Sequence, residues 1–127
     1  MYIKAQDKIP LFVYGTLRKG EKNNSLLENS KYLGLASTTD KYTLILDGGV
    51  PFLLDIPYTY ITGDLYEIDL QTLKNIDALE GHPELYKRKL IETVLPSGEK
   101  ILASTYFDNI KINETGSFKS QKWRELC

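Results

Sequence analysis

The sequence predicts a mixed α+β fold, in which a small sheet of six or seven strands closes, or nearly closes, into a barrel-like form. Two observations support this prediction. Strand-like segments separated by turn residues run through most of the 127-residue chain. One segment near the middle has helical periodicity, and a shorter helix is expected after the first strand. So many strands in so few residues favour a closed sheet with the main helix packed on its side.

The expected elements can be placed along the chain in order. Residues 11–14 form a short apolar run that ends at Gly15, which is typical of a buried strand entering a turn. A polar stretch over residues 18–24 precedes the short helix, expected at 25–29. Further strands are expected at 32–39, 42–46, 50–56, 60–68, 86–95 and 101–107. The last two strands predict a hairpin around Pro96-Ser97-Gly98, and the tail at 109–127 shows no clear pattern.

The main helix is expected at about 69–80. Asp69 is a good N-cap, Gly81 suits the position just past the end, and Pro83 prevents the helix from resuming. The apolar half of its helical wheel is formed by Leu70, Leu73, Ile76 and Leu79. The polar half contains Gln71, Lys74 and Asn75.

Glu80 is the unusual residue of this helix. It falls near the middle of the apolar half, with Asp77 towards the edge of that half. Burial and the negative end of the helix dipole would both raise the pKa of Glu80, which suits a carboxylate to general base and acid catalysis. A fraying last turn that turns the side chain to solvent is the alternative, and the wheel leaves both open.

Composition limits the class of protein. Lys and Arg number 16 against 17 Asp and Glu, so the net charge of -1 gives no support for nucleic-acid binding. No stretch approaches a membrane span, and the single cysteine, Cys127, allows no intrachain disulfide. We expect one cytoplasmic, monomeric domain over residues 1–127.

No cofactor or metal is expected. The chain has one histidine, His82, in a turn expected to face solvent, and so cannot form a His-rich or Cys-rich zinc site. It also lacks the glycine-rich motifs that cradle nucleotide phosphates.

A second candidate feature is the loop Tyr14-Gly15-Thr16-Leu17. It follows a buried strand, and a glycine there lets backbone N–H groups converge on an anion or a developing oxyanion. An ordinary turn is the alternative interpretation. Tyr86 and Tyr106 are placed to line a pocket near the helix exit, although core packing would also explain them.

Taken together, three blocks resemble the γ-glutamylcyclotransferase-like (AIG2-like) family, and in particular its γ-glutamylamine cyclotransferase branch. They are LFVYGTLRKGEKNN, then VPFLLDIP with ITGDLYEID, and finally LKNIDALEGHPELYKRK, in that order over about residues 11–107. The chain departs from the branch at Phe52, where the branch tends to have Trp, and at Glu21-Lys22, where Gln-Pro is usual. The tail beyond Phe107 has no secure counterpart.

The resemblance implies a cofactor-free enzyme that converts a γ-glutamyl amine, typically γ-glutamyl-ε-lysine, to 5-oxoproline and the free amine. It implies that Glu80 is the catalytic base and acid, and that Tyr14, Gly15, Thr16 and Leu17 bind substrate. Tyr86 is a further candidate for substrate binding. Two alternatives stay open: a non-catalytic small-molecule binding domain of the same fold, and removal of a γ-glutamyl group from a specialised metabolite.

Overall fold

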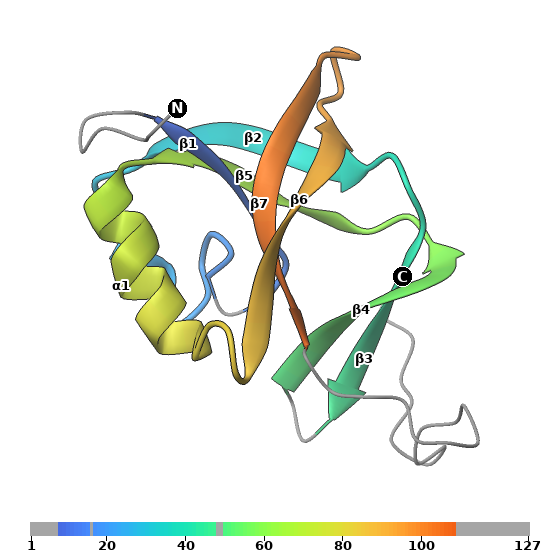
Figure 1. Ribbon diagram of the computed structural model, residues 1–127. Helices are drawn as coiled ribbons and strands as arrows, with labels where there is room; N and C mark the ends of the chain where they lie inside the picture. Colours follow the sequence, from blue (N-terminus) through green and yellow to red (C-terminus); the bar gives the residue numbers. More distant parts are fainter. Residues whose placement is uncertain (1–7, 16, 48–49, 109–127) are drawn as a thin grey trace.

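A computed structural model of the chain describes residues 8–15, 17–47 and 50–108 (Figure 1). Its elements in chain order are β1 (Ile9–Val13), a 3-10 helix η1 (Asn24–Leu27), β2 (Lys31–Thr38), β3 (Tyr42–Asp47), β4 (Val50–Thr59), β5 (Thr62–Ile68), α1 (Leu70–Glu80), β6 (Tyr86–Val94) and β7 (Lys100–Asp108). The mixed α+β class, the main helix and the short helical turn agree with the sequence prediction.

Five of the strands close into a barrel in the order β1-β5-β2-β6-β7. Neighbouring strands are antiparallel except where β7 returns to β1, a parallel contact with Leu11 opposite Ser104. Alternate residues of a strand point to opposite faces, and β1 shows this clearly. Phe12 belongs to one buried cluster with Leu65 and Ala103, whereas Leu11 belongs to a second cluster that includes helix residues.

The prediction of six or seven strands in the closed sheet was wrong, because β3 and β4 pair with each other as a separate two-stranded sheet. This hairpin projects from the barrel between β2 and β5 (Figure 1). Its base is closed by two hydrogen bonds: the Thr38 N–H donates to the Ile61 carbonyl at 2.9 Å, and the Ile61 N–H donates to Thr38 Oγ1 at 3.0 Å. Strand β2 therefore pairs directly with β5, and residues 39–61 form an excursion between them.

Helix α1 begins and ends as its sequence predicts. Asp69 Oδ1 accepts a hydrogen bond from the Thr72 N–H at 2.8 Å, and Gly81 has φ 67° just past the helix end. Leu73 and Ile76 are buried in the second cluster, on the outside of the barrel. The helical wheel places Leu79 on the buried, apolar half, but its side chain is 45% exposed. The last turn of α1 faces a pocket rather than a packed strand.

The tail at 109–127, with its predicted lack of pattern, lies outside the described residues, as does Thr16. Within the described ranges, no helix has the length and apolar character needed to cross a membrane.

Candidate active site

The end of α1, the loop after β1 and the start of β6 surround a pocket of about 220 Å³. This volume is below the range of pockets that hold drug-sized ligands, so the pocket suits a small molecule or one end of a larger one. Six residues of its lining are ones that the sequence placed at a site or a pocket, namely Tyr14, Gly15, Leu17, Glu80, Tyr86 and Tyr106. The structure therefore brings together residues that are up to 92 positions apart in the sequence.

Glu80 is the last residue of α1 and lies at the pocket, half-buried. Burial raises the pKa of its carboxyl group from 4.5 to about 7. Within the described part of the chain, the carboxylate has no hydrogen bond or ion pair that would offset this burial. The placement favours the first of the two interpretations of the wheel, a carboxylate in a desolvated site, over a side chain turned to solvent.

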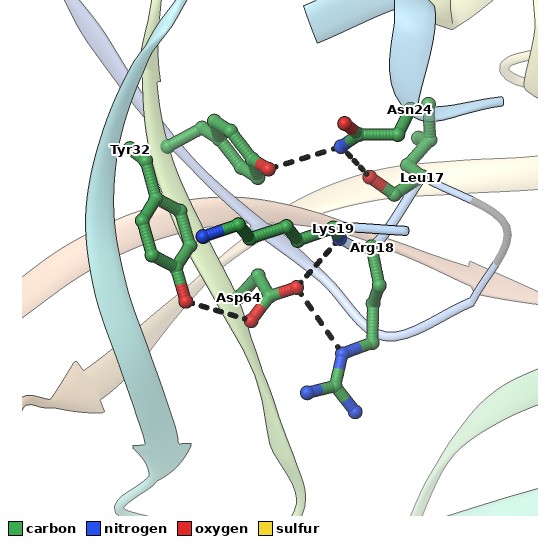
Figure 2. A network of polar contacts seen from close by, with 7 residues as sticks. Leu17, Arg18, Lys19, Asn24, Tyr32 and Asp64 are labelled. Atoms are coloured by element: carbon green, nitrogen blue, oxygen red, sulfur yellow. Dashed lines mark hydrogen bonds and ion pairs between the residues drawn. The ribbon is translucent and has the colours of Figure 1, made fainter. Parts of the chain in front are cut away.

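A buried carboxylate on β5 holds the loop that follows β1. Asp64 is 2% exposed, and its Oδ2 accepts hydrogen bonds from the Lys19 backbone N–H at 2.8 Å and from Arg18 Nε at 3.3 Å. Its Oδ1 accepts from the Tyr32 hydroxyl at 3.2 Å. Figure 2 shows these three donors arranged around the Asp64 carboxylate. A buried charge is tolerated when donors satisfy it in this way, so Asp64 anchors the loop to the barrel.

The other end of the loop is fixed by Asn24. Its Nδ2 donates to the Leu17 carbonyl at 2.9 Å and to the Tyr66 hydroxyl at 3.0 Å. Leu17 is itself buried in the cluster that contains Ile76 of α1. The loop is thus attached to both β5 and the helix layer, which sets its position relative to Glu80.

Gly15 is needed where the loop approaches β4. A Cβ atom at this position would lie 2.9 Å from Cγ of Pro51, closer than real contacts allow. Both residues line the pocket. The glycine therefore lets the loop pass close to the start of β4, at the turn end of the hairpin, and helps define the pocket wall.

Tyr14 and Tyr106 connect β1, β7 and α1 beside Glu80. The Tyr14 hydroxyl donates to the Tyr106 carbonyl at 2.5 Å, and the Tyr106 hydroxyl donates to Oδ1 of Asp77. Burial is the main cause that raises the pKa of Tyr14, Tyr86 and Tyr106, and the charge of Glu80 raises each of them further. All three phenols are therefore neutral near physiological pH.

The sequence predicted that His82 lies in a turn that faces solvent, but the structure shows it partly buried. The His82 Nδ1 accepts a hydrogen bond from the Arg88 backbone N–H at 3.0 Å. That contact ties the turn after α1 to β6. Elsewhere in the described ranges, no three His, Cys, Asp or Glu side chains are grouped as metal ligands would be.

Sequence reasoning missed Asp64, Asn24 and the pairing of Asp77 with Tyr106. Asp64 carried a readable signal, because it interrupts an otherwise buried strand in the segment ITGDLYEID. Asp77 and Tyr106 are 29 residues apart, and no local pattern links them.

Comparison with known proteins identifies the class to which this fold and site belong. Residues 11–125 match the family described as gamma-glutamyl cyclotransferase, AIG2-like. The chain belongs to this family, and several of its relatives are named as cyclotransferase enzymes.

Particular relatives agree with this assignment. A protein of Methanocaldococcus jannaschii, provisionally named a gamma-glutamylcyclotransferase, is 43% identical over 99 residues, covering 76% of this chain and 82% of its own length. The gamma-glutamylaminecyclotransferase of Rattus norvegicus is 33% identical over 65% of this chain, and the match covers 61% of the rat protein. A crystal structure of an AIG2-like protein from Mus musculus has a TM-score of 0.78 at 24% identity, covering 96% of this chain and 97% of the mouse chain, which shows the shared fold.

Proposed function

We propose that this protein converts γ-glutamyl amines to 5-oxoproline and the free amine by intramolecular attack. The α-amine nitrogen of the substrate forms a bond to its own γ-carbonyl carbon, and the bond from that carbon to the leaving nitrogen breaks. The α-ammonium group loses two protons, one before its nitrogen attacks and one as the ring closes. The leaving nitrogen gains one proton as its bond to the carbon breaks, and a second when the free amine becomes an ammonium ion. No water molecule is consumed, and the reaction is a rearrangement of bonds within one substrate.

The observation that supports this proposal most strongly is the position of Glu80 in a small pocket, with a pKa raised to about 7 by burial. A carboxyl group with this pKa is ionised often enough near neutral pH to accept a proton, and acidic enough in turn to return it. Glu80 would take the proton from the substrate's α-ammonium group and deliver it to the leaving amine. One residue can serve both steps because the two nitrogen atoms are bonded to the same ring-closing centre.

The loop from Tyr14 to Leu17 would hold the γ-glutamyl end and the negative charge that develops on the γ-carbonyl oxygen. The anchors at Asp64 and Asn24 support this role, since a pre-positioned loop does not have to reorganise during the reaction. The tethered nucleophile contributes much of the rate, because effective molarities of intramolecular reactions are worth roughly 7–11 kcal/mol of barrier.

The leaving amine is the finer part of the proposal. The rat relative is named for γ-glutamyl amines, and γ-glutamyl-ε-lysine is the first substrate to test. A pocket of about 220 Å³ supports recognition of the γ-glutamyl end, with the leaving group at the rim near Lys22 and Leu79. Phe52 packs against Tyr86, which lines the pocket, with ring centroids 6.3 Å apart. We also predict a monomeric, cytoplasmic enzyme that needs no cofactor or metal.

The test is release of 5-oxoproline from a panel of γ-glutamyl amines and γ-glutamyl amino acids, with wild type and Glu80→Gln compared. We expect wild type to turn over at least one amine and the variant to lose roughly 100-fold or more, the contribution of a general base. Wild type that is inert on the whole panel would instead support a non-catalytic binding domain. Turnover only of a larger γ-glutamyl conjugate would support deprotection of a specialised metabolite.

A further inference from the structure

The hydroxyl group of Tyr106 donates its one proton to another residue of the protein. Tyr106 lines the pocket from β7 and donates that proton to Oδ1 of Asp77, which lies one helical turn before Glu80. A phenol has one proton to donate and lone pairs that accept. Towards the pocket, the Tyr106 oxygen can therefore act only as a hydrogen-bond acceptor.

Asp77 is held in place from β6 and from the turn after α1. Its Oδ1 lies 3.4 Å from Nε of Arg88, and its backbone carbonyl accepts from the His82 N–H at 3.0 Å. The Arg88 backbone N–H donates in turn to Nδ1 of His82. These contacts keep an anionic acceptor against the Tyr106 hydroxyl, so the direction of the Tyr106 hydrogen bond is fixed by the fold.

The neighbouring phenols do not supply a donor in its place. The Tyr14 hydroxyl donates to the Tyr106 carbonyl at 2.5 Å, and the Leu53 backbone also hydrogen-bonds to it. The hydroxyl of Tyr86 lies 3.5 Å from the Pro51 carbonyl, at the limit of a hydrogen bond. The Glu80 carboxylate and the Tyr106 hydroxyl oxygen thus both present hydrogen-bond acceptors on the same side of the pocket.

The charges that act on this side of the pocket are negative. After burial, the charge of Glu80 is a cause of the raised pKa of Tyr14, Tyr86 and Tyr106, and the charge of Asp108 adds to the first two. The one cationic side chain among the described residues that line the pocket is Lys22, which comes from the loop after β1. A positively charged group with several N–H donors, such as a primary ammonium, fits the Glu80 wall best.

We propose that the Tyr106 hydroxyl oxygen accepts a hydrogen bond from the α-ammonium group of the ligand beside Glu80, and that Asp77 is the positioning residue that keeps Tyr106 in this orientation. The inference rests on the proposed function for the identity of the ligand as a γ-glutamyl compound. Tyr106 then holds the nitrogen while Glu80 removes one of its protons. The remaining N–H groups keep contact with Tyr106, and the freed lone pair is directed at the γ-carbonyl carbon.

The experiment measures the affinity of two ligands for protein carrying Glu80→Gln, in which turnover is expected to be slowed roughly 100-fold or more. One ligand is a γ-glutamyl amide, and the other is the same amide with hydrogen in place of the α-amine. Adding Tyr106→Phe should reduce the preference for the amine-bearing ligand roughly 10-fold or more, since a hydrogen bond to a charged group is lost. Tyr42→Phe is the matched control, because Tyr42 is also a buried tyrosine, packs on Phe107 and lies outside the pocket lining.

Substitutions of Asp77 test its positioning role in the same background. Asp77→Asn retains an oxygen that accepts the Tyr106 proton and should keep most of the preference, whereas Asp77→Ala should lower it. A merely structural role would weaken both ligands equally in Tyr106→Phe, and that result would overturn the inference. If the preference falls as expected but no γ-glutamyl amine yields 5-oxoproline, the proposed function fails while the ammonium site stands. If 5-oxoproline forms and the preference is unchanged, the ammonium site alone fails.

Discussion

The ionised Glu80 carboxylate should destabilise the fold that contains it. The pKa of Glu80 is raised by burial from 4.5 in the unfolded reference to about 7 in the folded protein. Below about pH 4.5 the group is protonated in both states and contributes nothing. Between about pH 4.5 and pH 7 the carboxyl group ionises in the unfolded state but stays largely protonated in the folded state. The free energy of unfolding therefore falls progressively over this range, and the loss is complete above about pH 7.

The size of the effect follows from the shift. A shift from 4.5 to about 7 corresponds to at most about 3–4 kcal/mol, since one pKa unit is worth about 1.4 kcal/mol, and the partial exposure of Glu80 reduces this free energy. Glu80→Gln keeps the shape of the side chain and removes the charge. We expect the free energy of unfolding of the variant to exceed that of wild type by about 2–3 kcal/mol near pH 8, although the same variant should release 5-oxoproline roughly 100-fold or more slowly.

Denaturant unfolding of both proteins between about pH 4 and pH 8 measures this difference directly. The gain should vanish near pH 4, where wild type is also neutral at this position. Glu28→Gln is the control, because Glu28 is exposed and keeps its hydration in the folded state. A Glu80→Gln variant that is no more stable than wild type near pH 8, or equally stabilised near pH 4, would refute a desolvated carboxylate.

Three further predictions follow from the site. In steady-state assays, kcat/KM should rise with pH up to about 7 and then level, because Glu80 acts as a base only when ionised; a flat profile from about pH 5 to pH 7 would contradict this. Asp64→Ala should raise KM and lower the free energy of unfolding by roughly 1–3 kcal/mol, since the Lys19 N–H loses its acceptor; unchanged KM in a stable variant would show that the loop needs no anchor. Gly15→Ala should cost roughly 1–3 kcal/mol in chemical unfolding and reduce activity, because its Cβ meets Pro51, and adding Pro51→Ala should recover part of both; no recovery would argue against this contact as the cause.

The helix could be predicted in detail because its signals are local. Asp69 and Gly81 act on backbone groups within one turn, so the chain itself specifies where α1 begins and ends. The periodicity also separated Glu80 from its polar neighbours without any tertiary information. Leu79 was misassigned by the same pattern, since a wheel reports direction but not whether a packed strand or a pocket lies opposite.

The closure of the sheet and the environment of Glu80 depend on contacts between distant segments. Strands β3 and β4 lie outside the barrel, in an excursion whose ends are joined by bonds between Thr38 and Ile61, which are 23 residues apart. The pairing of Tyr106 with Asp77 is likewise tertiary. Strand-like patterns predict that segments are extended, but they do not predict which segments pair, so the strand count of the barrel could not be obtained from them.

In the proposed reaction, the nucleophile is the substrate's own α-amine and Glu80 is the base. The identity of the nucleophile is tested most directly by turnover of a γ-glutamyl amine in water labelled with heavy oxygen, followed by mass spectrometry of the products. We expect 5-oxoproline that contains no label, released together with the free amine, and no glutamate. Labelled glutamate as the first product would mean that water, and not the α-amine, attacks the γ-carbonyl carbon.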